Sequence, residues 1–100
     1  MNYDEEELAE LTAKIKAWPL GQYVQLMKFV RAHWKYADEC YWTEEVGDRW
    51  HRYMISTVGW SDNEALVSAL EDNSMFWMTC WESSRRGGHY DFVVSLPEAL

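Results

Sequence analysis

The spacing of hydrophobic positions changes near residue 37 and divides the chain into two parts. From Asp4 to Trp18, apolar side chains recur every three or four residues, and the stretch from Tyr23 to Trp34 repeats this spacing. This period is typical of amphipathic helices, and Pro19 separates the two stretches. We expect two helices with so short a link to pack as an antiparallel pair, a helical hairpin over residues 1–36.

Beyond this point the hydrophobic period becomes two, which indicates β-strands. The stretches Tyr41–Val46 and Arg49–Thr57 flank Gly47-Asp48, and they are expected to form a hairpin with a two-residue turn. A short helix should follow, because Ser61 and Glu64 have the form of a capping box at its start.

A second hairpin is expected at the end of the chain. Met75–Ser83 and His89–Leu96 alternate around residues 84–88, where two glycines permit positive φ. Residues 40–96 therefore form a predicted ββαββ portion. The fold class is α+β, with the N-terminal helix pair followed by a mostly antiparallel sheet in a single domain over residues 1–100.

Composition narrows the function classes. The chain has 48% hydrophobic and 16% aromatic residues, which is typical of a protein that folds. Seven tryptophans are many for 100 residues, and the 17 Asp and Glu residues outnumber the 9 Lys and Arg residues to give a net charge of -8. Direct nucleic acid binding is therefore not expected. No apolar stretch is long enough to span a bilayer, so no membrane partner is expected either.

The sequence shows no catalytic or metal-binding pattern. Cys40 and Cys80 are too far apart in sequence for a metal knuckle, and we expect both to be free, structural thiols. His33, His51 and His89 lack the spacing of a metal site. No cofactor is expected, and the residues favour a non-enzymatic protein without deciding the question.

Two turns carry the candidate ligand-binding chemistry. The helix start at Gly59–Glu64 offers backbone amides, and the turn at Ser84–His89 offers further amides and two arginines. If both turns lie at one end of the sheet, they form a pocket for a small anionic ligand. The alternative is that these residues only cap a helix and turn the chain. The candidate ligand-binding residues are Trp60, Ser61, Asn63, Glu64, Arg85, Arg86, His89 and Tyr90.

An acidic, Trp-rich surface is the second candidate. Large amphipathic rings anchor protein interfaces, and clustered acids suit a basic partner. The candidate interface residues are Glu44, Glu45, Asp48, Trp42 and Trp34, with Trp60 and Trp81 as further anchors. The alternative is that the acids serve solubility alone. Exposed aromatic strands equally suit a homodimer.

The C-terminal half carries a distinctive string of residues. It comprises residues 55–64, the pairs Phe76-Trp77 and Cys80-Trp81, and the run from Ser83 to Tyr90, and contains GWSDNE and SSRRGGHY. This string resembles that of a family of small phage and prophage proteins of uncharacterised function. Val58 stands where a second glycine is expected in that family. The resemblance implies phage infection of a bacterial cytoplasm as the setting, and it implies no reaction.

These observations lead to two hypotheses. The leading one is a phage-encoded, non-enzymatic interaction protein that binds and blocks a host defence or nucleic-acid-processing protein through the acidic, Trp-rich surface. The alternative is a protein that binds or sequesters a small anion or nucleotide with the turns at Gly59–Glu64 and Ser84–His89. Charge reversal on the acidic surface should abolish the first activity, whereas loss of Arg85 and Arg86 should abolish the second.

Overall fold

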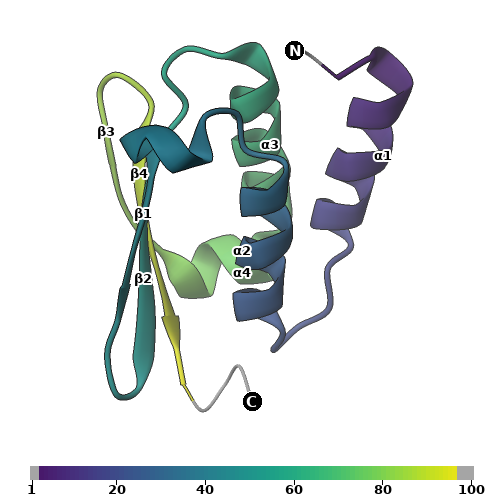
Figure 1. Ribbon diagram of the computed structural model, residues 1–100. Helices are drawn as coiled ribbons and strands as arrows, with labels where there is room; N and C mark the ends of the chain where they lie inside the picture. The colour runs from purple at the N-terminus through teal and green to yellow at the C-terminus, as the bar shows by residue number, and fades with distance from the viewer. Residues whose placement is uncertain (1–2, 97–100) are drawn as a thin grey trace.

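The computed structural model describes residues 3–96 and places helices over one face of an antiparallel sheet (Figure 1). This arrangement confirms the expected α+β class. The elements in chain order are α1 (Glu5–Lys16), α2 (Tyr23–Ala32), the irregular helical turn η1 (Ala37–Tyr41), β1 (Trp42–Val46), β2 (Trp50–Ser56), α3 (Ser61–Asp72), α4 (Ser74–Cys80), β3 (Trp81–Arg85) and β4 (His89–Ser95).

The sheet has the strand order β1-β2-β4-β3, so β2 and β4 are central and β1 and β3 are edges. Tyr53 of β2 lies opposite Phe92 of β4, and both side chains are buried beneath the helices. Because side chains alternate along a strand, their neighbours Arg52 and Asp91 lie on the opposite, open face. The sheet therefore offers one face to the core and leaves the other uncovered.

The N-terminal helices form where the sequence predicts them, but α1 packs differently from the expectation. Its main partner is α3 rather than α2. The side chain of Asn73, at the end of α3, donates a hydrogen bond to the carbonyl oxygen of Ile15 at 3.0 Å. Contact with α2 runs through long side chains, such as the ring of Trp18 on that of Phe29 at 5.4 Å. This tertiary hydrogen bond joins the end of α1 to the end of α3.

One predicted strand is wrong in its first part, because residues 75–80 form the helix α4 and only Trp81 begins β3. Phe76 and Cys80 are buried four residues apart, which is a helical spacing. Asn73 starts this helix by accepting a hydrogen bond from the amide of Phe76 at 3.3 Å. A short apolar run does not by itself distinguish a strand from a buried helix.

The predicted capping box at Ser61 and Glu64 is also wrong. Trp60 precedes α3, and no side chain caps its start. The preceding turn explains the shift, because the amide of Trp60 donates to the carbonyl oxygen of Thr57 at 3.0 Å. A capping box does form elsewhere, at α1, between Asp4 and Glu7.

The first hairpin forms as predicted, with its turn displaced by one residue. Val46 pairs with His51, and the amide of Gly47 donates to the carbonyl oxygen of Trp50 at 2.9 Å. The two turn residues are therefore Asp48 and Arg49 rather than Gly47 and Asp48. A Cβ atom at Gly47 would overlap the ring of Trp50, so this position requires glycine for close packing.

Candidate functional site

The two turns singled out by the sequence lie at the same end of the sheet (Figure 1). The amide of Thr57, just before α3, donates a hydrogen bond to the carbonyl oxygen of Gly88 in the β3–β4 hairpin at 3.0 Å. Gly88 has φ of 81°, and a Cβ atom there would overlap the side chain of Thr57. This close approach requires glycine and joins the two turns.

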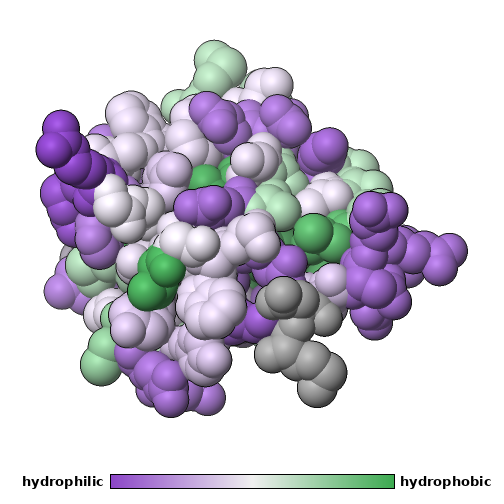
Figure 2. Space-filling model, turned by 90° about the horizontal axis from the view of Figure 1, so that it is seen from above, coloured by the Kyte–Doolittle hydropathy of each residue, from purple (hydrophilic) through white to green (hydrophobic). Residues whose placement is uncertain are grey.

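The end of the molecule that carries these turns is largely polar. Seen from above, it is mostly purple or near-white, and its green residues stand in small separate groups (Figure 2). Arg86, at the hairpin tip, is exposed and makes no ion pair with a described residue. This end of the molecule is therefore more typical of a binding site for a polar ligand than of a broad apolar docking surface.

The residues that α3 and its N-cap contribute to the predicted ligand site mostly make contacts within the fold. Asn63 is completely buried, and its side-chain oxygen accepts a hydrogen bond from the amide of Lys35 at 2.9 Å. The ammonium group of Lys35 lies 4.9 Å from the centre of the Trp60 ring. The ring of Tyr36 lies 5.6 Å from the same Trp60 ring. Ser61 and Glu64 are exposed on the first turn of α3. Asn63 therefore joins α2 to α3 and is not available to a ligand.

The hairpin side of the predicted site borders a shallow hollow of about 260 Å³ on the open face of the sheet. Arg85 and His89 line it, so it holds two of the predicted ligand-binding residues, whereas Trp60 and Ser61 do not line it. Cys40 lines it too and is exposed, in contrast to the buried Cys80, and neither cysteine is in a disulfide bond. The remaining lining residues are Tyr41, Thr43, Met54, Ile55, Ser56 and Asp91.

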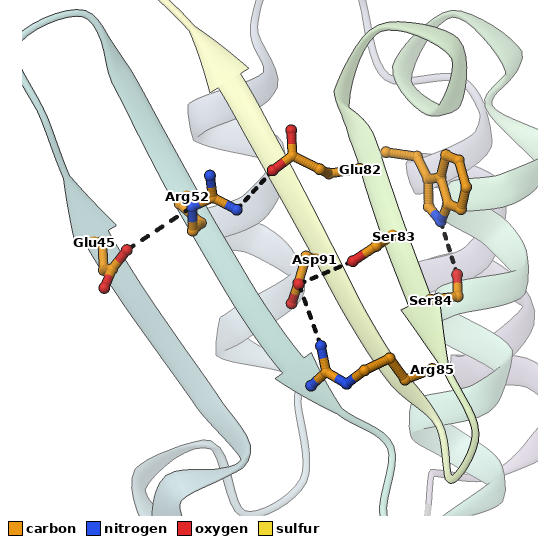
Figure 3. Close-up of polar contacts among 8 residues, drawn as sticks. Glu45, Arg52, Glu82, Ser83, Ser84, Arg85 and Asp91 are labelled. Atoms are coloured by element: carbon orange, nitrogen blue, oxygen red, sulfur yellow. Dashed lines mark hydrogen bonds and ion pairs between the residues drawn. The ribbon is translucent and has the colours of Figure 1, made fainter.

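Charges on the open face are paired across the strands (Figure 3). Arg52 lies 2.7 Å from Glu82 and 3.8 Å from Glu45, so one guanidinium connects both edge strands. Arg85 lies 3.5 Å from Asp91. An anion that enters the hollow would therefore compete with the Asp91 carboxylate for the Arg85 guanidinium.

Two predicted interface residues belong to the core. Trp34 and Trp42 are each 5% exposed, and their rings meet edge to face at 5.4 Å. The indole N–H of Trp42 donates to Glu44 at 2.9 Å, while the pKa of the neighbouring Tyr53 is raised by burial and by the charge of Glu44. These contacts stabilise the core, and neither tryptophan can anchor a partner in this structure.

The three acids predicted for the same interface differ in their surroundings. Glu44 lies 3.9 Å from the guanidinium of Arg31, and Glu45 lies 3.8 Å from that of Arg52. Asp48 is exposed in the hairpin turn and forms no ion pair with a described residue. They surround the first hairpin, where Trp50 is 38% exposed.

A further group of exposed apolar side chains lies on α4 and at the start of β3, where the sequence analysis named Trp81 alone. Met75, Met78 and Trp81 are 49%, 78% and 42% exposed. We call these three residues the Met-Trp stripe. Met75 and Met78 lie three residues apart, which is the spacing of one helix face, and Trp81 follows the helix as the first residue of β3. The same positions are scattered over both faces of a strand, so the wrong prediction for residues 75–80 concealed the stripe.

The ring of Trp81 is held in a defined orientation. It stacks on the ring of Trp77 at 6.1 Å and an interplanar angle of 19°. Its indole N–H donates to the hydroxyl oxygen of Ser84 at 2.8 Å. A side chain fixed in this way loses little further freedom when a partner covers it.

The surroundings of the stripe are acidic. Residues 53–84 contain five acidic residues and no Lys or Arg. Glu71 and Asp72 occupy the last turn of α3, which has no basic residue, although a helix C-terminus favours cations. Lys16 of α1 lies 3.7 Å from Asp72 and offsets part of this charge. Of the five acidic residues in this stretch, Asp62 is buried, Glu64 lies in the first turn of α3 and Glu82 is paired with Arg52, so Glu71 and Asp72 are the acids that directly precede α4.

Three further findings describe the chain as a whole. Comparison with models of protein families, with curated proteins and with solved structures finds no match. Within residues 3–96, no three His, Cys, Asp or Glu side chains gather as metal ligands would. No helix among these residues has the length and apolar character needed to cross a bilayer. Fold and surface together define an α+β protein with an open sheet face and an acidic surface that exposes methionine and tryptophan.

Proposed function

We propose that this chain is a non-enzymatic interaction protein that binds a basic partner protein through an acidic, Trp-bearing surface. This surface consists of the end of α3, the outer side of α4 and Trp81. The observation that carries the proposal is the coincidence of exposed apolar side chains with the exposed carboxylates of Glu71 and Asp72 at the end of α3.

The chemistry of the surface supports this function. Exposed apolar side chains rimmed by charges are typical of protein interaction sites. Methionine adapts to varied partner shapes, and a fixed tryptophan adds a large contact area. In the phage setting that the resemblance implies, the partner is a host defence or nucleic-acid-processing protein. Such proteins present basic surfaces to nucleic acid, and an acidic protein that occupies one blocks it without catalysis.

A second function is favoured by a different observation, the hollow on the open face. Arg85 and His89 lie at its edge, beside a hairpin whose Gly87 and Gly88 have positive φ. Such turns present backbone amides to anions. This arrangement supports binding of a small anion such as phosphate or a nucleotide, with Asp91 as the internal competitor for Arg85.

Two double variants separate these functions. Glu71→Lys/Asp72→Lys should abolish capture of proteins from a bacterial lysate, whereas Arg85→Ala/Arg86→Ala should capture the same proteins as the wild type. Thermal unfolding with phosphate and a nucleotide panel is measured in parallel, since a ligand of the folded state raises the midpoint. A nucleotide-dependent shift that disappears in the arginine variant, with capture unaffected by the acidic variant, would replace the first function with the second.

A further inference from the structure

We infer that the Met-Trp stripe docks a basic amphipathic helix of the partner, with its apolar side on Met75, Met78 and Trp81 and its Lys or Arg side chains toward the surrounding acids. This inference rests on the proposed function and deepens it by naming the site and the kind of segment that fills it. Helix docking through methionine and aromatic side chains is an established mode of recognition.

The first argument is the distribution of apolar residues around α4. Phe76 and Cys80 are buried on its inner side, so the outer side of a surface helix should be polar. Met75 and Met78 instead lie on the outer side together with the polar Ser74 and Thr79, and Met78 is 78% exposed. Large apolar side chains exposed next to each other are typical of a site that a partner covers. A partner that covers α4 would provide that environment.

Charge identifies the partner. Glu71 and Asp72 end the helix before α4, and Glu82 follows Trp81. Asp72 is paired with Lys16 and Glu82 with Arg52. Glu71, which forms no ion pair with a described residue, and the C-terminal end of the α3 dipole supply the negative potential that a segment covering the stripe meets. A second copy of the chain would bring another net charge of -8 to the contact. A basic segment therefore complements this surface, and a second copy does not.

The neighbouring edge strand argues for a helix rather than an added strand. β3 has only five residues, and its pairing with β4 shifts between Trp81 and Ser83. A bulge of this kind disrupts the regular ladder that strand addition needs and protects an edge from it. The partner segment therefore contacts the stripe through side chains, as packed helices do.

The probe for this inference is a labelled peptide of about 14 residues, roughly four helical turns, with Leu and Lys at amphipathic spacing. Its twin carries Glu in place of every Lys. We expect the wild type to bind the Lys peptide, with weaker binding as salt rises, and not to bind the Glu peptide. Dissociation constants are measured by fluorescence anisotropy, and circular dichroism verifies that each variant is folded.

Two variants test the stripe itself. Met78→Lys and Met75→Ala/Met78→Ala should each raise the Kd for the Lys peptide by about tenfold or more, as expected for central interface residues. Both methionines are exposed, so neither change removes core packing. The matched control is Leu20→Ala in the α1–α2 link, where Leu20 is 66% exposed, and its Kd should equal that of the wild type.

The outcomes distinguish failure of the site from failure of the function. If the wild type binds the Lys peptide and the methionine variants bind it equally well, the stripe is not the site, while the acidic interaction function survives. If neither peptide binds, the proposed function fails as well. Equal binding of the Glu peptide overturns the charge argument. A wild-type dimer in solution that Met78→Lys converts to a monomer would assign the stripe to a second copy of the chain.

Discussion

One turn of the backbone holds a residue in a conformation that its side chain disfavours. Val58 has φ of 53° and Gly59 has φ of 73°, in the turn that leads into α3. Positive φ at two adjacent residues is the pattern that glycine and asparagine favour, whereas a β-branched side chain is strained there. Val58 is also the position at which the resemblance leads one to expect glycine. The positive φ of Val58 therefore indicates backbone strain in this turn.

Replacement of Val58 by Gly should stabilise the protein. Relief of left-handed strain is worth about 1–2 kcal/mol, of which the greater freedom of glycine in the unfolded chain removes about half. The midpoint of thermal unfolding should rise by a few degrees. Gly59→Ala is the control, because no atom lies within 4 Å of the added Cβ and only backbone strain acts. That variant should be destabilised, and a lower midpoint for Val58→Gly would contradict the argument.

At the scale of elements, the junction between α3 and α4 holds the helical layer together. Asn73 is 6% exposed, and its side chain both accepts and donates hydrogen bonds. Its side-chain oxygen caps α4, and its side-chain nitrogen donates to the carbonyl oxygens of Ile15 and Trp18 at the end of α1. One amide thus connects three helices and positions the outer side of α4, which carries the proposed site.

Removal of this amide should loosen α1 and α4 together. Asn73→Ala removes a side-chain donor to the carbonyl oxygens of Ile15 and Trp18 and also removes a cap, at a cost of about 2 kcal/mol. Asn73→Asp retains the acceptor that caps α4 and loses the donor to α1. Urea unfolding measures the cost, and amide hydrogen exchange should show faster exchange in both helices for Ala but mainly near Ile15 for Asp. Equal exchange patterns in the two variants would refute this division.

At the scale of the whole molecule, charge is distributed unevenly. The acids of the open sheet face are paired with Arg52 and Arg85, whereas Glu71, at the end of α3, forms no ion pair with a described residue. Glu71 lies at the helix end where the macrodipole favours cations. An acidic residue that lowers the stability of its own helix but complements a basic partner is typical of a functional surface.

Replacing the Glu71 carboxylate by a cation should therefore raise the stability of the protein and weaken its binding of a basic peptide. Glu71→Lys should raise the free energy of unfolding by about 0.5 kcal/mol through the helix dipole and weaken binding of a basic peptide. Glu64→Lys in the first turn of α3 changes the net charge equally but opposes the dipole, so it should lower stability. Thermal unfolding and peptide anisotropy measure both effects. A loss of stability in both variants would rule out the dipole argument.

The candidate sites show where local pattern was sufficient for prediction. Arg85 and His89 were predicted because glycines and charges mark a hairpin tip in sequence, and the structure places both at a hollow. Met75 and Met78 were missed because their apolar run was assigned to a strand. Trp34 and Trp42 looked like anchors, yet the packing of one ring against the other buries them.

The sequence by itself determined those features that depend on neighbours along the chain. Hydrophobic period specified α1, α2 and the strands, glycine specified the β3–β4 turn, and composition specified the acidic character. The tertiary structure alone decided the partner of α1, the helical state of residues 75–80 and the burial of each tryptophan. These features depend on contacts between distant residues, such as Asn73 with Ile15, whose free energy outweighs local preference.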